Sequence, residues 1–409
     1  MTVLRDILHN LGAARFNRHE IAGSLGDLGT FLPLLVGMAA TNGLDFAAAL
    51  FFAGLFNVVT GLMFAIPMAV QPMKAIAAVA LSGQGLTVGE IVAAGASVSA
   101  IILLLGLTGL IDWFNRVFPR SVIRGLQLAL GLKLLMNGIT MVAGTKYWFA
   151  LDGISTGLVA TVLVLLLFFS RRVPAALVLF GLGIVIAVWA KPEVIHSLGF
   201  GFTLPHWSPP SWADFVSSFP KAAVPQIPLT TLNSVIAVCA LSVDLFPDRP
   251  ATPRKVSISV GVMNLVGCWF GAMPMCHGAG GLAGQYRFGA RTNGAILFLG
   301  TVKVLLAVFL GASLMTLCQA FPHSILGVML AFAGMELALV CRDQTRRTDA
   351  FAMLLTAATC LGLDNIALGF VLGLTMAWCF RLGWFQISDE AEKAELEHPR
   401  QDSNLHEPA

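Results

Sequence analysis

The sequence predicts an all-α protein that crosses a membrane many times. Of its 409 residues, 57% are hydrophobic and only 11% are charged, and its mean hydropathy is +0.81. Soluble domains usually contain about 25% charged residues. Apolar stretches long enough to cross a bilayer as helices, roughly 17–25 residues, recur between Ile21 and Leu382. These observations together predict a polytopic membrane protein.

Fourteen membrane segments can be drawn along the chain. The third (72–83) and the tenth (277–288) are too short to cross a bilayer as helices. The segments are 20–40, 45–66, 72–83, 89–110, 120–142, 154–169, 173–190, 227–246, 254–271, 277–288, 293–312, 321–340, 347–362 and 364–382.

These segments divide the chain into five parts. Residues 1–19 form a basic amphipathic lead on the cytoplasmic side, without the apolar core and cleavage site of a secretory signal. Residues 20–190 hold the first seven segments and residues 227–382 the second seven. Between them, the Pro- and Trp-rich residues 191–226 form an extracytoplasmic connection. The acidic, polar residues 383–409 are expected to be a disordered cytoplasmic tail.

The distribution of basic residues predicts the orientation. Cytoplasmic loops of membrane proteins carry an excess of Lys and Arg. With a cytoplasmic N-terminus, twelve arginines and one lysine fall on the cytoplasmic side, and Lys146, Lys191 and Lys221 fall opposite. The cytoplasmic set is Arg116, Arg120, Arg124, Arg171, Arg172, Arg249, Arg254, Lys255, Arg287, Arg291, Arg342, Arg346 and Arg347. Both termini are therefore expected in the cytoplasm.

The two halves of the chain resemble each other. GLFNVVTGLMFAIPM from Gly54 matches GVMNLVGCWFGAMPM from Gly261 at an offset of 207 residues. A second match pairs FPRSVIRGLQLALGLKL from Phe118 with FPHSILGVMLAFAGMEL from Phe321. Arginines precede the first FPxS segment and follow the second, so the two copies enter the membrane from opposite sides. The sequence thus predicts an inverted repeat of seven plus seven segments, which is typical of secondary transporters.

Both short segments are broken by proline or glycine. In AIPMAVQPMKAIA (65–77), Pro72 disfavours a helical Gln71 and suits the first turn of a new helix. We therefore expect Met68–Gln71 to be extended and a half-helix to begin at Pro72. PMCHGAGG, from Pro274, predicts the same break in the second copy, with a half-helix beginning near His277.

Two half-helices that meet at their N-termini would form an anion site, because their first N–H groups are free and the helix dipoles favour negative charge. Lys74 lies in the first turn, where only a bound anion would make a cation favourable. Glycines at 278, 280 and 281 allow close approach of the backbone to a ligand. Three plainer interpretations stay open: simple kinks, a snorkelling Lys74, and His277 as a helix cap.

Candidate site residues follow from this arrangement, because intramembrane polar and ionisable residues are functional candidates. The predicted substrate-binding residues are Thr30, Gln71, Met73, Lys74, Asn233, His277, Gly278, Ala279 and Gly280. The predicted coupling or gating residues are Asp27, Asp244, Lys133 and Glu336. Asp27 and Asp244 also suit plain capping or interfacial roles, and Lys133 and Glu336 either pair or lie at a moving interface.

At these residues the chain resembles the molybdate transporter family, which is related to the SulP sulfate permeases. The matching stretches are GSLGDLGTFLPL, PMAVQPMKAIAA, PLTTLNSVIAV, DLFP and GAMPMCHGAGGLAGQYRFGAR. The resemblance implies uptake of molybdate, a core formed by the first four segments of each half, a gate formed by the last three, and anion binding between the third and tenth segments. Unlike most SulP proteins, the chain has no room for a STAS domain after Leu382.

The sequence therefore predicts a secondary active transporter for a tetrahedral oxoanion, molybdate before sulfate, working by alternating access. A sulfate transporter or an anion channel on the same fold stays open as the alternative. A nucleobase permease fits less well, because Asn233 stands where a carboxylate is expected. An enzyme is disfavoured, since HExxH, GxSxG and P-loop motifs are absent. The seven scattered cysteines support neither a disulfide framework nor a metal site.

The expected partners are few. They are the oxoanion, the lipid bilayer and a coupling proton, with no cofactor and no nucleic acid; a homodimer is left open. Proton coupling is favoured because a dianion that enters a negative-inside cell works against the potential, about 2.3 kcal/mol per charge per 100 mV. The expected location is the bacterial inner membrane.

Overall fold

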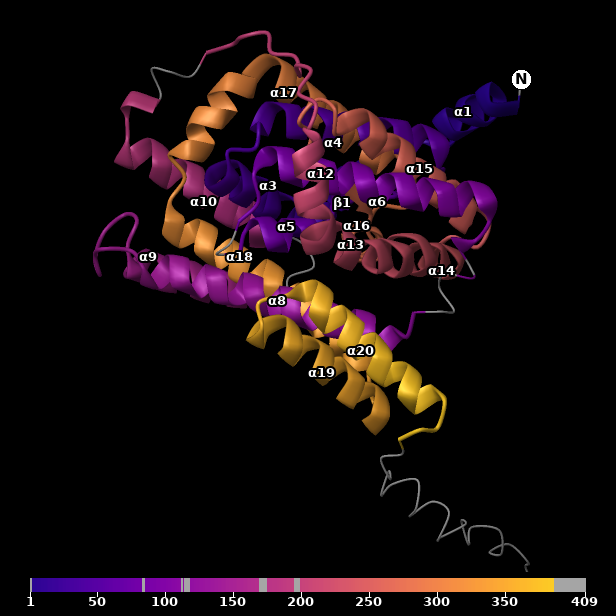
Figure 1. The fold of residues 1–409 in the computed structure, drawn as a ribbon. Coiled ribbons are helices and arrows are strands. Elements are labelled where there is room, and N and C mark those ends of the chain that lie inside the picture. Colours follow the sequence, from indigo (N-terminus) through magenta and orange to yellow (C-terminus); the bar gives the residue numbers. More distant parts are fainter. Residues whose placement is uncertain are drawn as a thin grey trace, which may run out of the picture.

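The computed structural model describes residues 2–82, 85–111, 113, 118–168, 175–194 and 199–385, and it is almost entirely helical there (Figure 1). All fourteen predicted segments contain helix. The first-half helices are α1 (Thr2–Ala13), α2 (Arg18–Ser24), α3 (Leu28–Asn42), α4 (Phe46–Met63), α5 (Lys74–Ala80), α6 (Val88–Thr108), α8 (Arg120–Ala143), α9 (Ile154–Phe168) and α10 (Ala175–Ala190). The second-half helices are α12 (Trp212–Ser218), α13 (Val224–Leu229), α14 (Ala237–Leu245), α15 (Pro253–Gly267), α16 (Ala279–Arg287), α17 (Gly294–Gln319), α18 (His323–Ala338), α19 (Arg347–Gly362) and α20 (Ile366–Arg381).

Among the described residues, six helices are long and apolar enough to cross a membrane, and a seventh is added if the run Arg18–Asn42, bent by 47°, counts as one span. The six are Phe46–Met63, Val88–Thr108, Arg120–Ala143, Trp212–Leu245, Gly294–Gly311 and His323–Asp343. Arg116, Arg171, Arg172 and residues 386–409 of the predicted tail lie outside the described residues.

The two predicted breaks form a small sheet. Strand β1 (Val70–Pro72) pairs antiparallel with β2 (Met275–His277), and Val70 lies opposite His277. Both half-helices begin two residues later than the sequence predicts. Helix α5 begins at Lys74 instead of Pro72, and α16 begins at Ala279 instead of near His277, because the strands of the ladder extend through Pro72 and His277.

The eighth segment is longer than predicted. Helix runs from Trp212 to Leu245 through two π-helical stretches, Phe219–Ala223 and Thr230–Ile236. Proline inside a helix removes a hydrogen bond and clashes with the preceding turn. Pro220 lies in the first π-helical stretch, and Pro225 and Pro228 lie in the α-helical segment Val224–Leu229 between the two stretches. The connection predicted over 191–226 therefore gives way to helix at Trp212.

The helices pack in two groups that mix both halves of the chain. In one group α4 packs on α17 and α6 on α15; in the other α8 packs on α18 and α19. In Figure 1, α8, α9, α19 and α20 lie along one side of the molecule. Glycines allow the closest approaches, as expected for helix interfaces in membranes. A Cβ at Gly54 would lie 2.6 Å from the Gly300 carbonyl oxygen, and one at Gly138 would overlap the Gly327 carbonyl.

Candidate functional site

A cavity of about 750 Å³ lies against both broken segments. Seven of the nine predicted substrate-binding residues line it: Thr30, Gln71, Lys74, Asn233, Gly278, Ala279 and Gly280. They come from α3, β1, α5, the π-helical stretch Thr230–Ile236 and the start of α16. The structure thus brings together residues that lie more than 240 positions apart in the sequence.

The N-terminus of α16 faces this cavity. The first N–H bonded back along the helix is that of Leu282, which donates to the Gly278 carbonyl at 3.0 Å. The N–H groups of Ala279, Gly280 and Gly281 precede this pattern and have no partner within the helix. A Cβ at Gly280 would meet no atom within 4 Å, whereas one at Gly278 would overlap Gln71 Oε1. Glycine therefore leaves room at 280 and is required by packing at 278.

The N-terminus of α5 is capped by a side chain from the second half. Gln226 Oε1 accepts hydrogen bonds from the N–H groups of Ala75, at 2.8 Å, and Ile76, at 3.4 Å. The Gln226 Nε2 group donates to Thr230 Oγ1 at 2.8 Å. Sequence reasoning missed Gln226 because residues up to 226 were assigned to a connection. The two half-helices are therefore not equivalent as anion sites.

Lys74 is the first residue of α5, is half-buried and lines the cavity. Its ammonium group interacts electrostatically with Glu336 and Asp27. Glu336, on α18, is exposed and lines the same cavity. A lysine in the interior of a membrane protein is costly, so its place at the cavity wall makes Lys74 a candidate functional group.

Two predicted ligands lie elsewhere, because the β ladder uses them. The Met73 N–H donates to the Pro274 carbonyl at 2.9 Å, so it is not free for a ligand. The His277 ring is fully buried, with Nε2 at 2.9 Å from Ser259 Oγ and Nδ1 at 3.1 Å from the Ala69 carbonyl. His277 acts as a structural link between β2, α15 and the residue before β1.

The predicted coupling residues have four different surroundings. Asp27 is fully buried and its Oδ1 accepts from Gln71 Nε2 at 2.7 Å. Asp244 is exposed at the end of α14, outside the cavity. Lys133 forms an ion pair with Asp364, and not with Glu336, which lines the cavity. Asp244 and Lys133 are thus not among the residues that line the cavity, and their coupling or gating roles stay predictions.

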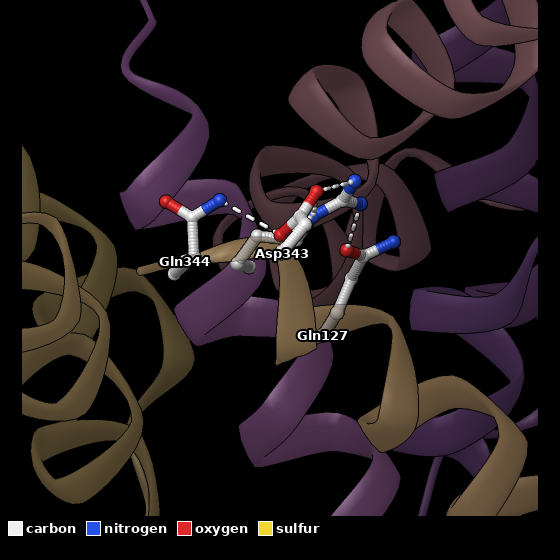
Figure 2. Close-up of polar contacts among 4 residues, drawn as sticks. Gln127, Asp343 and Gln344 are labelled. Atoms are coloured by element: carbon white, nitrogen blue, oxygen red, sulfur yellow. Dashed lines mark hydrogen bonds and ion pairs between the residues drawn. The ribbon is translucent and has the colours of Figure 1, made fainter. Parts of the chain in front are cut away.

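Three arginines also line the cavity, and sequence reasoning had used them only for orientation. They are Arg124, Arg287 and Arg342. The Nε of Arg124 lies 3.0 Å from both carboxylate oxygens of Asp343, and its Nη1 donates to Gln127 Oε1 at 2.9 Å. Figure 2 labels these two partners, Asp343 and Gln127. Arg287 and Arg342 are exposed. With Lys74, the three arginines give the cavity wall four cationic side chains against one carboxylate, that of Glu336, and an excess of one sign of charge concentrates ions of the opposite sign.

Similar proteins are found by sequence and by structure. The chain is 42% identical over 405 residues to Molybdate transporter 2 of Arabidopsis thaliana, covering 89% of this chain and 87% of that protein. It is 36% identical over 472 residues to Molybdate transporter 1 of Chlamydomonas reinhardtii, covering 88% and 91%. These relatives are plant and algal, and they do not support the expected bacterial location.

The fold resembles those of two solved anion transporters. One is the transmembrane domain of the cyanobacterium bicarbonate transporter BicA, with a TM-score of 0.64 and 13% identity, covering 89% of this chain and 98% of that chain. The other is murine Slc26a9 in the inward-facing state, with a TM-score of 0.70 and 13% identity, covering 94% and 72%. At these identities the similarity shows the fold alone: a mostly helical, multi-pass membrane protein.

The family comparison covers both halves of the cavity. Residues 19–134 and 218–337 match the family described as molybdate transporters of the MFS superfamily. These ranges include both strands of the ladder, both half-helices and all seven predicted residues that line the cavity. Together with the relatives of 36% and 42% identity, this match shows that the chain belongs to the molybdate transporter family.

Proposed function

We propose that the chain is a secondary active transporter that takes up molybdate by alternating access. One observation carries the proposal: a cavity beside the open N-terminus of α16 is lined by Lys74 and by polar side chains. A tetrahedral oxoanion accepts hydrogen bonds in every direction and donates almost none. It therefore suits a site built from N–H groups, a cation and amide or hydroxyl side chains. The names of the plant and algal relatives support molybdate as that anion.

The proposed ligands are the residues that surround this space. The backbone N–H groups of Gly278, Ala279 and Gly280 bind the anion together with the Lys74 ammonium group. Side chains of Gln71, Thr30 and Asn233 complete the site. A carboxylate in direct contact would repel the anion, so Asp27 stays outside the first layer of contacts.

The proposed architecture is an inverted repeat of seven plus seven segments. The β ladder supports it, because Val70 lies opposite His277 and these residues differ by the repeat offset of 207. Two antiparallel strands related by a two-fold axis pair equivalent residues at the axis. The mixed packing of α4 with α17 and α6 with α15 supports a core made from both halves, and that of α8 with α18 supports a gate.

Binding competition tests the substrate directly. Purified protein should bind molybdate, and tungstate of the same charge and shape should displace it more readily than sulfate does. Tighter binding of sulfate than of molybdate would favour a sulfate transporter. In vesicles, molybdate flux should saturate and should be accelerated by molybdate on the opposite side, since a carrier exchanges its substrate. Flux that stays proportional to concentration would indicate a channel instead.

The proposed orientation gives a separate prediction. Both termini lie in the cytoplasm, and the connection around Thr203–Pro210 lies on the opposite side, because the basic loops collect on the cytoplasmic face. Reporter fusions after Gly383 and insertions at residues 203–210 should therefore report opposite sides. Reporters on the same side would contradict the fourteen-segment topology, even if molybdate binding is intact.

A further inference from the structure

Three buried polar atoms form a path from the cavity to α17. They are Gln71 Oε1, Asp27 Oδ2 and Lys303 Nζ, and each is without a hydrogen-bond partner among the described residues. A buried polar atom without a partner destabilises the fold, and more so when it is charged. Three such atoms beside one site leave these groups open to a second arrangement in which they are satisfied.

Lys303 is the least expected of the three. Its side chain, on α17, is 3% exposed, and its Nζ lies 3.6 Å from the centroid of the Phe31 ring. Phe31 follows Asp27 by one helical turn, and Asp27 is the charged group that interacts electrostatically with Lys303. The ammonium group thus has an aromatic face and one carboxylate as its surroundings. Burial opposes a charge on Asp27, and Lys303 favours it, so the balance between the two forms of Asp27 depends on Lys303.

When Asp27 is ionised, its carboxylate fixes the orientation of Gln71. A carboxylate accepts hydrogen bonds and donates none, so the Gln71 Nε2 group points to Asp27 Oδ1, at 2.7 Å, and also contacts Thr30 Oγ1. The Oε1 atom is consequently directed at Gly278, where α16 begins. This places a hydrogen-bond acceptor beside the proposed oxoanion, which is itself an acceptor.

We propose that a proton on Asp27 reverses the Gln71 carboxamide and so prepares the anion site, and that Lys303 sets the pH at which this occurs. A protonated Asp27 donates its O–H, as the Thr30 hydroxyl can, to Gln71 Oε1. The Nε2 group then turns toward Gly278 and donates to the oxoanion. The proton comes from cavity water and stays on Asp27, so no covalent bond to the anion is involved.

This inference rests on the proposed function and deepens it to proton–anion symport. Because coupling between two binding sites is reciprocal, a proton on Asp27 tightens anion binding and the anion holds the proton. Lys303 is a positioning residue in this scheme, since it acts on the anion through Asp27 and Gln71. A dianion that binds with protons also opposes the membrane potential less.

Other ionisable groups around Asp27 have separate roles. Lys74 on α5 and the Cys276 thiol on β2 interact with it electrostatically. Lys74 is a proposed ligand, so its loss should weaken binding at every pH. On the neighbouring helices, Glu20 of α2 accepts from the N–H groups of Arg291 and Thr292. The remaining ionisable groups on α2 and α16 are exposed; they are Arg18, His19 and Arg287.

The test measures molybdate affinity of the purified full-length protein from acidic to alkaline pH. Wild-type affinity should fall as the pH rises, by at most about tenfold per pH unit for one proton. In Lys303→Met the apolar stem remains but the charge is lost, so Asp27 keeps its proton to higher pH. The fall in affinity should therefore move upward by about one pH unit or more. Lys303→Arg should keep the wild-type profile.

Asp27→Asn provides the second measurement, because asparagine cannot titrate. This variant should bind molybdate with an affinity that is independent of pH across the range in which the wild type varies, and concentrative uptake driven by a pH gradient should be lost. Lys191→Met, the same change at an exposed lysine, should leave the profile unchanged.

Two results would overturn the inference: an unchanged pH profile in a folded Lys303→Met, or a wild-type pH profile in Asp27→Asn. If Lys303→Met fails to fold, Asp27→Asn decides alone. If the wild type binds no molybdate at any pH, the proposed function itself is refuted. This outcome differs from failure of the proposed protonation of Asp27, in which molybdate still binds.

Discussion

Gly280→Val is expected to abolish molybdate binding while the protein stays folded. A Cβ at this position meets no atom within 4 Å, so the side chain enters the cavity rather than the protein interior. It would hold the anion away from the first N–H groups of α16. Each charge-assisted hydrogen bond contributes about 1.5–3 kcal/mol, so losing two weakens binding about 100-fold or more. Isothermal titration with molybdate measures the loss.

The matched control is Gly181→Val. Gly181 lies on α10, and a Cβ there also meets no atom within 4 Å. It does not line the cavity, so this variant should bind molybdate as the wild type does. Wild-type affinity in Gly280→Val, with thermal unfolding unchanged, would place the anion away from α16 and contradict the proposed site.

Lys74→Ala is expected to weaken molybdate binding roughly tenfold or more, from about 1.5–3 kcal/mol for one charge-assisted contact. The ammonium group lines the cavity at the start of α5, where the helix dipole disfavours a cation unless an anion is bound. The free energy of unfolding without ligand should change little, because the side chain forms no ion pair within 4.0 Å among the described residues.

Lys191→Ala serves as the control, since Lys191 is exposed at the end of α10. It removes the same charge far from the cavity and should leave the affinity unchanged. Equal affinities for Lys74→Ala and the wild type would show that Lys74 has a structural role only.

The breaks and most of the cavity could be predicted because proline and glycine act locally. Pro72 and the glycines from 278 to 281 mark the ends of helices whatever surrounds them. The repeat then predicted that the two breaks meet. This is why Gln71, Lys74 and Gly280 were assigned to one site from the sequence.

The errors come from contacts between distant parts of the chain. Which N–H groups remain free depends on the ladder register, and this register uses the Met73 N–H and moves both helix starts by two residues. His277 seemed a ligand because its partners, Ser259 and Ala69, are known only once α15 and β1 are placed.

The positions of two residues, Gln226 at the start of α5 and Lys303 beside Phe31, could not be predicted from the residues around them in the sequence. Gln226 stands between Pro225 and Pro228, a pattern typical of a loop, yet it lies in the α-helical segment Val224–Leu229, between the two π-helical stretches. Lys303 is a single charge in an apolar helix and is indistinguishable in sequence from a snorkelling lysine. Its burial depends on the packing of α17 against α4 and Phe31.

The β1–β2 ladder also constrains how the protein is made. Val70 and His277, which lie opposite each other, are 207 residues apart, and at roughly 5–20 residues per second the ribosome needs about 10–40 s to synthesise that length. Throughout that interval the backbone groups of Val70–Pro72 lack their native partners inside a membrane, where unsatisfied groups are costly. The nascent first half therefore has to be sheltered, by the insertion machinery or by water, until β2 emerges. Completion of the proposed anion site is consequently a late step of biogenesis, and a chain truncated before β2 cannot reach it.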